Sequence, residues 1–339
     1  MIFVTGGSGL VGSFLIPALI ARGHQVRALY RKTIPQLENT GEIEWLEGDI
    51  RDTGLLRTAL QNVTHVFHCA GLVSYAPQDE EALQQVNVEG TATIVDACLE
   101  HPGVRLCHVS SVAALGGAQT PESVAGQKVK VLDENAKWDL GAEHPAYATS
   151  KYLGELEVWR GISEGLSAVM VNPSVILGPA DWDRSSTRLF RYAYNEHAFY
   201  TPGFVNAVDV RDVVDAMLRL TFDTAISGER FILSAEVISL WELLGQAAAC
   251  FGKKPPTTSV PNWAAEIIWR LEHARAMLTG ARPLITKDTA RAGRRAVEYR
   301  ADKVQQAIDF RFRPLSETIK WCCAHLRTNP AASGAVVVS

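Results

Sequence analysis

Short apolar runs alternate with segments of helical character along the first half of the chain. The apolar runs lie at residues 2–5, 25–30, 42–45, 63–68 and 104–109, and the helical segments lie near 53–61, 82–100 and 146–163. This alternation predicts strands joined by helices in a doubly wound parallel sheet, an α/β fold. Past Pro173 the alternation breaks down, so we expect a smaller, mainly C-terminal α/β lobe beside the sheet.

The first apolar run ends in a glycine-rich turn. Thr5 and Gly6 open the stretch TGGSGLVG, Gly9 and Gly12 follow, and a largely apolar helical run occupies residues 13–20. Glycines let the backbone approach a pyrophosphate, whose charge is met by the N–H groups at the start of a helix. A lone motif of this kind is often a flexible turn. Placed between a strand and a helix, it predicts dinucleotide binding on a Rossmann-type sheet.

The end of the second apolar run bears on the choice of cofactor. A carboxylate there accepts hydrogen bonds from the adenosine ribose of NAD, whereas a cation pairs with the 2′-phosphate of NADP. The chain has Tyr30 followed by Arg31 and Lys32. We therefore expect NADP to be preferred, with NAD possible; the alternative is a solvated basic loop.

Tyr147 and Lys151 lie one helical turn apart, so both side chains project from one helix face. The pKa of a free tyrosine is near 10, and lowering it to about 7 requires roughly 4 kcal/mol of phenolate stabilisation. A neighbouring lysine cation supplies part of that free energy. The spacing predicts a proton-transfer site, although a pair on a surface helix is the alternative for this motif alone.

The glycine loop, the Tyr147–Lys151 pair and five further motifs resemble, in their order along the chain, the extended short-chain dehydrogenase/reductases, also called the NAD-dependent epimerase/dehydratase family. The resemblance covers nearly the whole chain. The further motifs are Asp49–Ile50, His68–Gly71, Asn87–Thr91, Val109–Ser111, and Asn172–Ser174 with Gly178–Pro179.

By this resemblance, Asp49 and Ile50 hold the adenine, and Ala70 and Gly71 pass beside the cofactor. The cofactor-binding set predicted from the motifs and the resemblance together comprises Thr5, Gly6, Gly9, Leu10, Val11, Gly12, Arg31, Lys32, Asp49, Ile50, Ala70, Gly71, Asn87, Ser110, Tyr147, Lys151, Pro173 and Ser174.

The resemblance also implies a catalytic Ser-Tyr-Lys set. Ser111 is chosen over Ser110 because the family's catalytic serine directly precedes the loop that spans 112–116 here. Nicotinamide delivers hydride to a carbonyl carbon while Tyr147 protonates the oxygen and Ser111 donates a hydrogen bond to it. Lys151 also holds the nicotinamide ribose in family members. The structural alternatives are that Ser111 only caps the end of a strand and that Lys151 is an exposed cation on a helix.

Three local features distinguish branches of the family. Dehydratases have an Asp-Glu pair after the strand-five hydroxyl, where this chain has Val112-Ala113. Many sugar-nucleotide epimerases have a phosphate-binding arginine where this chain has residues 203–207, which include no cation. The Asn-Pro-Ser motif and the phrase VDVRDV look more like the dihydroflavonol reductase, cinnamoyl-CoA reductase and 3β-hydroxysteroid dehydrogenase branch.

An aromatic cluster is expected to wall the substrate pocket, since pockets for hydrophobic ligands are lined in this way. Ordinary cores have the same composition. The cluster comprises Tyr75, Phe190, Tyr192, Tyr194, Phe199, Tyr200 and Phe204.

The family resemblance implies that the chain passes between two lobes. We expect residues 1–173 and about 206–235 to form the dinucleotide-binding domain, and about 174–205 with 236–327 to form the substrate lobe. Residues 328–339 are small and turn-rich, which predicts a disordered tail. Residues 117–143 lengthen the loop between Ser111 and Tyr147, and they suggest an irregular flap, either a lid or a passive insertion.

Composition narrows the remaining possibilities. A chain of 339 residues with a net charge of −4 lacks the broad basic face that binds nucleic acid. No apolar run approaches the roughly 20 residues that span a bilayer, so a membrane partner is not expected. The six cysteines follow no disulfide or metal-site spacing, which favours a reducing cytoplasm and no bound metal. By resemblance, the helices at 87–100 and 147–163 pack as a homodimer.

The sequence thus predicts an NADP-preferring oxidoreductase that interconverts a carbonyl and a hydroxyl on a hydrophobic small molecule. A sugar-nucleotide epimerase with tightly bound NAD is the first alternative. A dinucleotide sensor without turnover is the second, and the intact Tyr147 and Lys151 argue against it.

Overall fold

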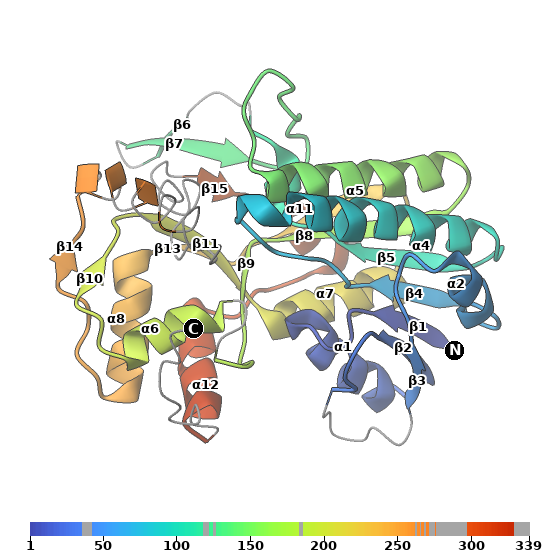
Figure 1. Cartoon of the computed structure of the whole chain (residues 1–339), viewed down its shortest axis with the longest axis horizontal. Coiled ribbons are helices and arrows are strands. Elements are labelled where there is room, and N and C mark those ends of the chain that lie inside the picture. Colours follow the sequence, from blue (N-terminus) through green and yellow to red (C-terminus); the bar gives the residue numbers. More distant parts are fainter. Residues whose placement is uncertain are drawn as a thin grey trace.

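The computed structural model describes residues 1–35, 43–117, 122–124, 127–182, 186–261 and 297–328, with isolated positions between 263 and 275. Its largest element is a sheet of seven parallel strands in the order β12-β8-β5-β4-β1-β2-β3 (Figure 1). The strands are β1 (Ile2–Thr5), β2 (Val26–Tyr30), β3 (Ile43–Glu47), β4 (His65–His68), β5 (Arg105–Val109), β8 (Ser167–Pro173) and β12 (Glu229–Leu233). The prediction of a doubly wound parallel sheet is confirmed.

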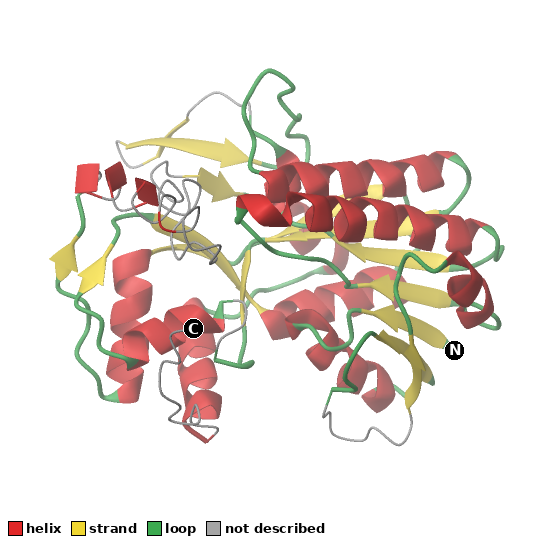
Figure 2. Cartoon of the chain, in the orientation of Figure 1, coloured by secondary structure: helices red, strands yellow, loops and turns green. Residues whose placement is uncertain are grey.

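Helices cover both faces of this sheet (Figure 2). In β1, Phe3 packs into a core with α2, α4 and α5, whereas Val4 packs into a core with α1, α7 and α11; both side chains are fully buried. Because side chains alternate across a strand, two buried faces explain the uninterrupted apolar runs. The helices are α1 (Leu10–Ala21), α2 (Thr53–Ala59), α4 (Gly90–Leu99), α5 (Ala146–Ser163), α7 (Val210–Phe222) and α11 (Asp302–Ile308). Among the described helices, none is long and apolar enough to cross a membrane.

The winding of the sheet reverses between β1 and β4. From β1 the chain moves outward to β2 and β3, and from β4 it moves outward in the other direction to β5, β8 and β12. In sheets of this kind ligands bind beyond the carboxyl ends of the strands, at the reversal. Thr5, His68 and Val109 end their strands at this edge.

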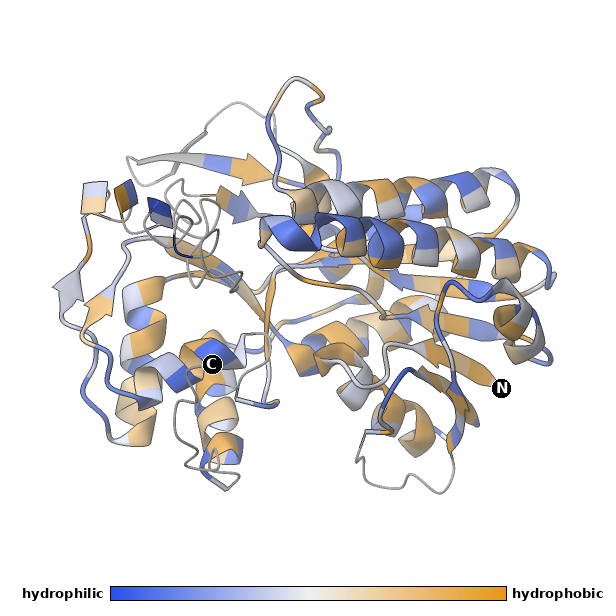
Figure 3. Cartoon of the chain, in the orientation of Figure 1, coloured by the Kyte–Doolittle hydropathy of each residue, from blue (hydrophilic) through white to orange (hydrophobic). Residues whose placement is uncertain are grey.

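A second core lies beside the sheet. The three-stranded sheet β13-β11-β9 packs with α6, α8 and α12 around buried side chains that include Phe190, Leu243 and Ile319. Figure 3 shows both apolar and polar positions along these helices, as expected when one face is buried. The elements are β9 (Val175–Leu177), α6 (Thr187–Tyr194), β10 (Phe199–Tyr200), β11 (Phe204–Asp209), β13 (Glu236–Ser239), α8 (Leu240–Phe251), β14 (Thr258–Ser259) and α12 (Leu315–Thr328), with β10 paired to β14.

Two segments differ from the expected elements. The helix expected at 82–100 consists of α3 (Glu80–Leu83), a π-helical turn (Gln84–Glu89) and α4, preceded by a 3-10 turn (Pro77–Asp79). The segment 117–143 is not irregular throughout, because β6 (Glu122–Val124) pairs with β7 (Gln127–Leu132), which also pairs with β15 (Val297–Tyr299). Residues 118–121 and 125–126 and the expected tail after Thr328 lie outside the described residues.

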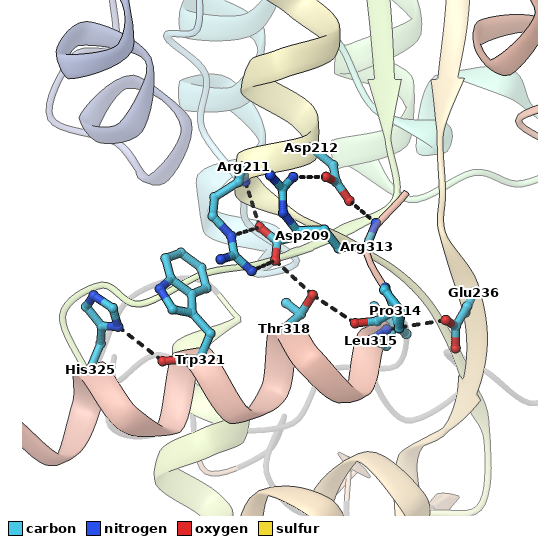
Figure 4. A network of polar contacts seen from close by, with 10 residues as sticks. All are labelled: Asp209, Arg211, Asp212, Glu236, Arg313, Pro314, Leu315, Thr318, Trp321 and His325. Atoms are coloured by element: carbon cyan, nitrogen blue, oxygen red, sulfur yellow. Dashed lines mark hydrogen bonds and ion pairs between the residues drawn. The ribbon is translucent and has the colours of Figure 1, made fainter. Parts of the chain in front are cut away.

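A buried ionic network joins α12 to the start of α7 (Figure 4). Asp209 is fully buried and accepts hydrogen bonds from Arg211 Nη2 at 2.6 Å and from Thr318 Oγ1 at 2.8 Å. The Arg211 guanidinium lies 3.8 Å from the ring centroid of Trp321. Asp212 pairs with Arg313 in the segment that leads into α12. The C-terminal helix is thus fixed to the large sheet by charged as well as apolar contacts.

Candidate active site

A cleft of about 1720 Å³ opens at the carboxyl edge of the seven-stranded sheet. One part is lined by the glycine loop and the ends of β4, β5 and β8, and the other by residues of α6, β11 and α8. The predicted residues that line it are Gly9, Leu10, Val11, Gly12, Gly71, Ser110, Ser111, Tyr147, Lys151, Pro173 and Ser174. No described residue of 117–143 is among the lining residues.

The glycine loop leaves no room for side chains at two positions. Gly6 has φ +70°, and a Cβ there would lie 2.5 Å from the backbone nitrogen of Ala70. A Cβ on Gly12 would lie 2.3 Å from the Gly6 carbonyl oxygen. The loop therefore closes tightly against β4 and directs the N-terminus of α1, which begins at Leu10, toward the cleft. This cradle fits a pyrophosphate.

Thr5 is placed beneath the loop rather than in the cleft. Its hydroxyl lies 2.7 Å from His68 Nδ1 and accepts a hydrogen bond from the Ala70 backbone nitrogen at 3.2 Å. Thr5 therefore fixes the turn at the end of β4, which includes Ala70, to the end of β1.

The residues expected at the adenosine lie at the ends of β2 and β3. Arg31 and Lys32 are exposed and make no ion pair with a described residue. Asp49 accepts hydrogen bonds from Arg51 N and Nε, each at 3.0 Å, and this contact lowers the pKa of Asp49. Ile50 is buried under Gly90. Two exposed cations, of which Arg31 also helps to lower the pKa of Asp49, thus stand at the position predicted to bind a 2′-phosphate.

The structure brings Ser111, Tyr147 and Lys151 together at the wall of the cleft. The Ser111 hydroxyl lies close enough to the Tyr147 phenol to act on its pKa. Ser111 Oγ also accepts from the Ala113 backbone nitrogen at 3.2 Å, which fixes the serine at the start of the 3-10 turn Val112–Leu115. Lys151 Nζ donates to the Val109 carbonyl at 2.8 Å, which leaves two further N–H donors.

The protonation of Tyr147 differs from the expectation. Burial raises the pKa of Tyr147 to about 12, and the neighbouring Ser111 hydroxyl only partly opposes this rise. Burial also lowers the pKa of Lys151 to about 8. The expected depression of the tyrosine pKa is therefore wrong for the protein alone, because desolvation outweighs the opposing effect of the Ser111 hydroxyl. Tyr147 is held as a neutral phenol, which is the form that donates a proton.

Asn87 lies in the π-helical turn and is bonded within the protein. Its Oδ1 accepts from Leu72 N at 2.7 Å, and its Nδ2 donates to Leu72 O and to Ser150 Oγ, both at 2.9 Å. A Cβ on Gly71 would lie 3.4 Å from Asn87 Oδ1 and 3.7 Å from Lys151 Nζ. Asn87 thus holds the loop after β4 beside Lys151 and does not itself line the cleft.

Two buried hydroxyls in the cleft have no hydrogen-bond partner. Ser110 Oγ and Ser174 Oγ are unpartnered, and both residues line the cleft near Pro173. Buried polar atoms in folded proteins are normally satisfied. A polar ligand group, such as the carboxamide of nicotinamide, satisfies such atoms, so the residues present fit a dinucleotide.

The predicted aromatic wall is wrong in part. Tyr75 and Phe204 line the cleft, and the Tyr75 ring lies edge-on to Tyr147 with centroids 5.6 Å apart. Phe190 is instead fully buried in the second core, and Tyr194 packs against Trp182 and Phe251. The other members, Tyr192, Phe199 and Tyr200, are not among the lining residues. A helical run of aromatics contributes to the core as readily as to a pocket.

Several lining residues carry no local sequence signal. They are Val73, Val175, Arg188, Leu240 and Tyr299, which come from separate loops, strands and helices. Tyr299 reaches the cleft because β15 pairs with β7 and its backbone nitrogen bonds Asn206 Oδ1 at 3.3 Å. Such convergence depends on the tertiary fold rather than on spacing along the chain.

Comparison with known proteins finds matches along nearly the whole chain. Residues 2–231 match the model of the NAD dependent epimerase/dehydratase family. "Putative dihydroflavonol 4-reductase" of Synechocystis sp. is 34% identical over 322 residues, covering 90% of this chain and 88% of that protein. The crystal structure of gox2253 has a TM-score of 0.80 at 30% identity and covers 98% of this chain and 99% of that one. MoeE5 in complex with UDP-glucose and NAD has a TM-score of 0.74 at 21% identity, covers 97% and 99% of the two chains, and shows the same fold.

Proposed function

The chain belongs to the NAD-dependent epimerase/dehydratase family and is an NAD(P)-dependent oxidoreductase, and from this premise we propose that it interconverts a carbonyl and a hydroxyl on a hydrophobic small molecule. The observation that carries the proposal is that Ser111, Tyr147 and Lys151 meet at the wall of one partly apolar cleft.

The proposed roles follow from the protonation of these side chains. A bound nicotinamide supplies hydride to the carbonyl carbon. The Tyr147 phenol, neutral because its pKa is raised to about 12, gives its proton to the carbonyl oxygen, which becomes the hydroxyl. Ser111 donates a hydrogen bond to the same oxygen. The Lys151 cation stabilises the phenolate left behind, and water returns a proton to it.

Exposed apolar side chains support a hydrophobic substrate. Val73 is 67% exposed, and Tyr75, Val175 and Phe204 are each more than 40% exposed; all four line the cleft. Large apolar side chains gathered at a concave surface mark a ligand site. We infer that they enclose the apolar part of the substrate next to Tyr147.

The proposal is tested by following reduced-nicotinamide absorbance with a panel of aromatic, steroid-like and aliphatic carbonyls, with NADPH and NADH in parallel. Turnover of at least one class supports a carbonyl reductase. Binding of NADPH without turnover of any carbonyl contradicts the proposal.

We propose that Arg31 and Lys32 select NADP. Replacing both with alanine removes two charged partners of a 2′-phosphate, and charged hydrogen bonds contribute about 1.5–3 kcal/mol each. We expect the Kd for NADPH to rise at least tenfold while the Kd for NADH changes less than twofold, measured by fluorescence titration. Lys254→Ala, an exposed cation that does not line the cleft, is the matched control. If the Kd values for NADPH and NADH change by the same factor or not at all, Arg31 and Lys32 do not contact the 2′-phosphate and form a solvated loop.

Arg188 favours a second candidate, a sugar-nucleotide epimerase with tightly bound NAD. Arg188 is exposed, lines the cleft from α6 and makes no ion pair with a described residue. A cation at this place suits the phosphates of a nucleotide sugar, although residues 203–207 include none. Nucleotide that survives purification, with conversion of a UDP-sugar and no net change in absorbance, would support the epimerase.

We also propose the two-lobe division expected from the sequence, with α11 on the sheet side because it packs against β12 and α7. The supporting observation is that the apolar residues of α6, α8 and α12 form a core of their own. That all six cysteines are free supports a reducing, cytoplasmic location.

We propose a homodimer that packs through α4 and α5, which lie side by side on one face of the sheet (Figure 1). Leu156, on α5, is 42% exposed and is the apolar position best placed for such a contact. We expect Leu156→Arg to halve the mass measured by light scattering. Leu140→Arg, at a loop residue that is 89% exposed, should leave the mass unchanged. A wild-type monomer would contradict the proposal.

A further inference from the structure

A carboxylate is buried directly behind the candidate site. Glu155 follows Lys151 by one turn of α5 and is 1% exposed. Its Oε2 accepts from Arg230 Nη1 at 3.0 Å, and its Oε1 accepts a short hydrogen bond from Asn172 Nδ2. A buried carboxylate requires such partners, because desolvating an unpaired charge is costly.

Asn172 connects this carboxylate to the serine. Its Nδ2 also donates to the Ser111 carbonyl oxygen at 3.0 Å, so one amide group bridges Glu155 and Ser111. The Ser111 carbonyl oxygen and Glu155 Oε1 are both hydrogen-bond acceptors. In a flipped amide the Asn172 Oδ1 atom, which cannot donate, would face both of them. The orientation is therefore fixed by the network.

Arg230 connects the same carboxylate to the arm that leads into α5. Its Nη2 donates to the carbonyl oxygens of Glu134 and Ala136, both at 2.8 Å. Farther along this arm, Trp138 stacks on Tyr152 of α5 with centroids 4.3 Å apart. Glu155 therefore lies where the Ser111 turn, α5 and the arm after β7 meet.

We propose that Glu155 is a positioning residue: it fixes the Ser111 turn through Asn172, and it provides the negative charge that keeps Lys151 cationic. The inference rests on the proposed function, because Ser111 and Lys151 are taken as the residues that act on the carbonyl and on Tyr147.

Glu155, which also pairs with Arg230, is the carboxylate that acts on the charge of Lys151. Three groups from other elements also act near Lys151. Burial raises the pKa of the Cys69 thiol, which follows β4, so this thiol is neutral. Burial lowers the pKa of His68 in β4, to about 3, and that of His108 in β5. Both are therefore neutral near pH 7, and Tyr147 is neutral as well. Burial lowers the pKa of Lys151 to about 8, and Glu155 opposes this fall. Removing the Glu155 charge should lower the pKa of Lys151 further.

The experiment compares two variants. Glu155→Gln keeps the length of the side chain and removes its charge, whereas Glu155→Asp keeps the charge and shortens the side chain by one methylene group. The pKa of Lys151 is measured in each intact protein by competitive acetylation with acetic anhydride and peptide mass spectrometry, and the pH dependence of kcat is recorded alongside. In Glu155→Gln we expect the Lys151 pKa and the basic limb of kcat to fall together by about one pH unit. In Glu155→Asp we expect kcat to fall about tenfold, because the shorter side chain no longer positions Asn172, while the basic limb of the pH dependence of kcat stays at the wild-type pH.

Glu157→Gln is the matched control, since Glu157 lies on the same helix and pairs with Arg160. Thermal melts show which variants fold. If Glu155→Gln does not fold, the kcat of Glu155→Asp still tests the inference. An unchanged Lys151 pKa in folded Glu155→Gln, or wild-type kcat in Glu155→Asp, would overturn the inference. The acetylation result does not depend on turnover. A shifted Lys151 pKa in a protein that reduces no carbonyl would support the charge role of Glu155 while rejecting the proposed function.

Discussion

Tyr147→Phe should lower kcat for carbonyl reduction about 10³-fold, within the range of general acid catalysis. The substitution keeps the ring that packs edge-on to Tyr75 and removes the proton that the proposed mechanism transfers. The fold should persist, since Ser111 Oγ keeps its bond from the Ala113 nitrogen. Because the phenol is not needed to hold the pyrophosphate, the Kd for NADPH should change less than threefold. Single-turnover absorbance measures the rate and fluorescence titration measures the Kd.

Tyr152→Phe is the matched control for this prediction. Tyr152 lies on the same helix, stacks on Trp138 and does not line the large cleft. Its loss should leave kcat within twofold of wild type. A loss smaller than tenfold in Tyr147→Phe would reject Tyr147 as the proton donor. An equal loss in both variants would indicate a general effect on α5.

The parts of the protein that the sequence predicted are those determined by local spacing. Alternating apolar runs place five of the seven strands, β1 to β5, because a strand buried on both faces reads as a continuous apolar segment. The glycine loop is equally local: Gly6 and Gly12 stand where any Cβ would meet backbone. Tyr147 and Lys151 reach one wall of the cleft because a single helix carries both.

The remaining features depend on contacts between distant segments. Tyr299 and Arg188 meet in one cleft, although more than a hundred positions separate them along the chain. The raised pKa of Tyr147 comes from burial, which spacing does not reveal. The network of Glu155, Asn172 and Arg230 joins α5 to two strands of the sheet. In the sequence alone, these polar residues cannot be distinguished from solvent-exposed ones, because their burial depends on tertiary contacts.

Arg211→Ala should lower the free energy of unfolding by about 3–5 kcal/mol, the cost of leaving one charge of a buried pair without its partner. Asp209 is fully buried and would keep only its bonds from the Arg211 backbone nitrogen and Thr318 Oγ1 (Figure 4). The stacking of the guanidinium on Trp321 is lost as well. Urea denaturation measures the change. Arg57→Ala, which breaks an exposed pair with Glu100, should change the same free energy much less, because water screens that pair. If both variants lose the same small amount, Asp209 is reached by water and the network does not fix α12 to α7.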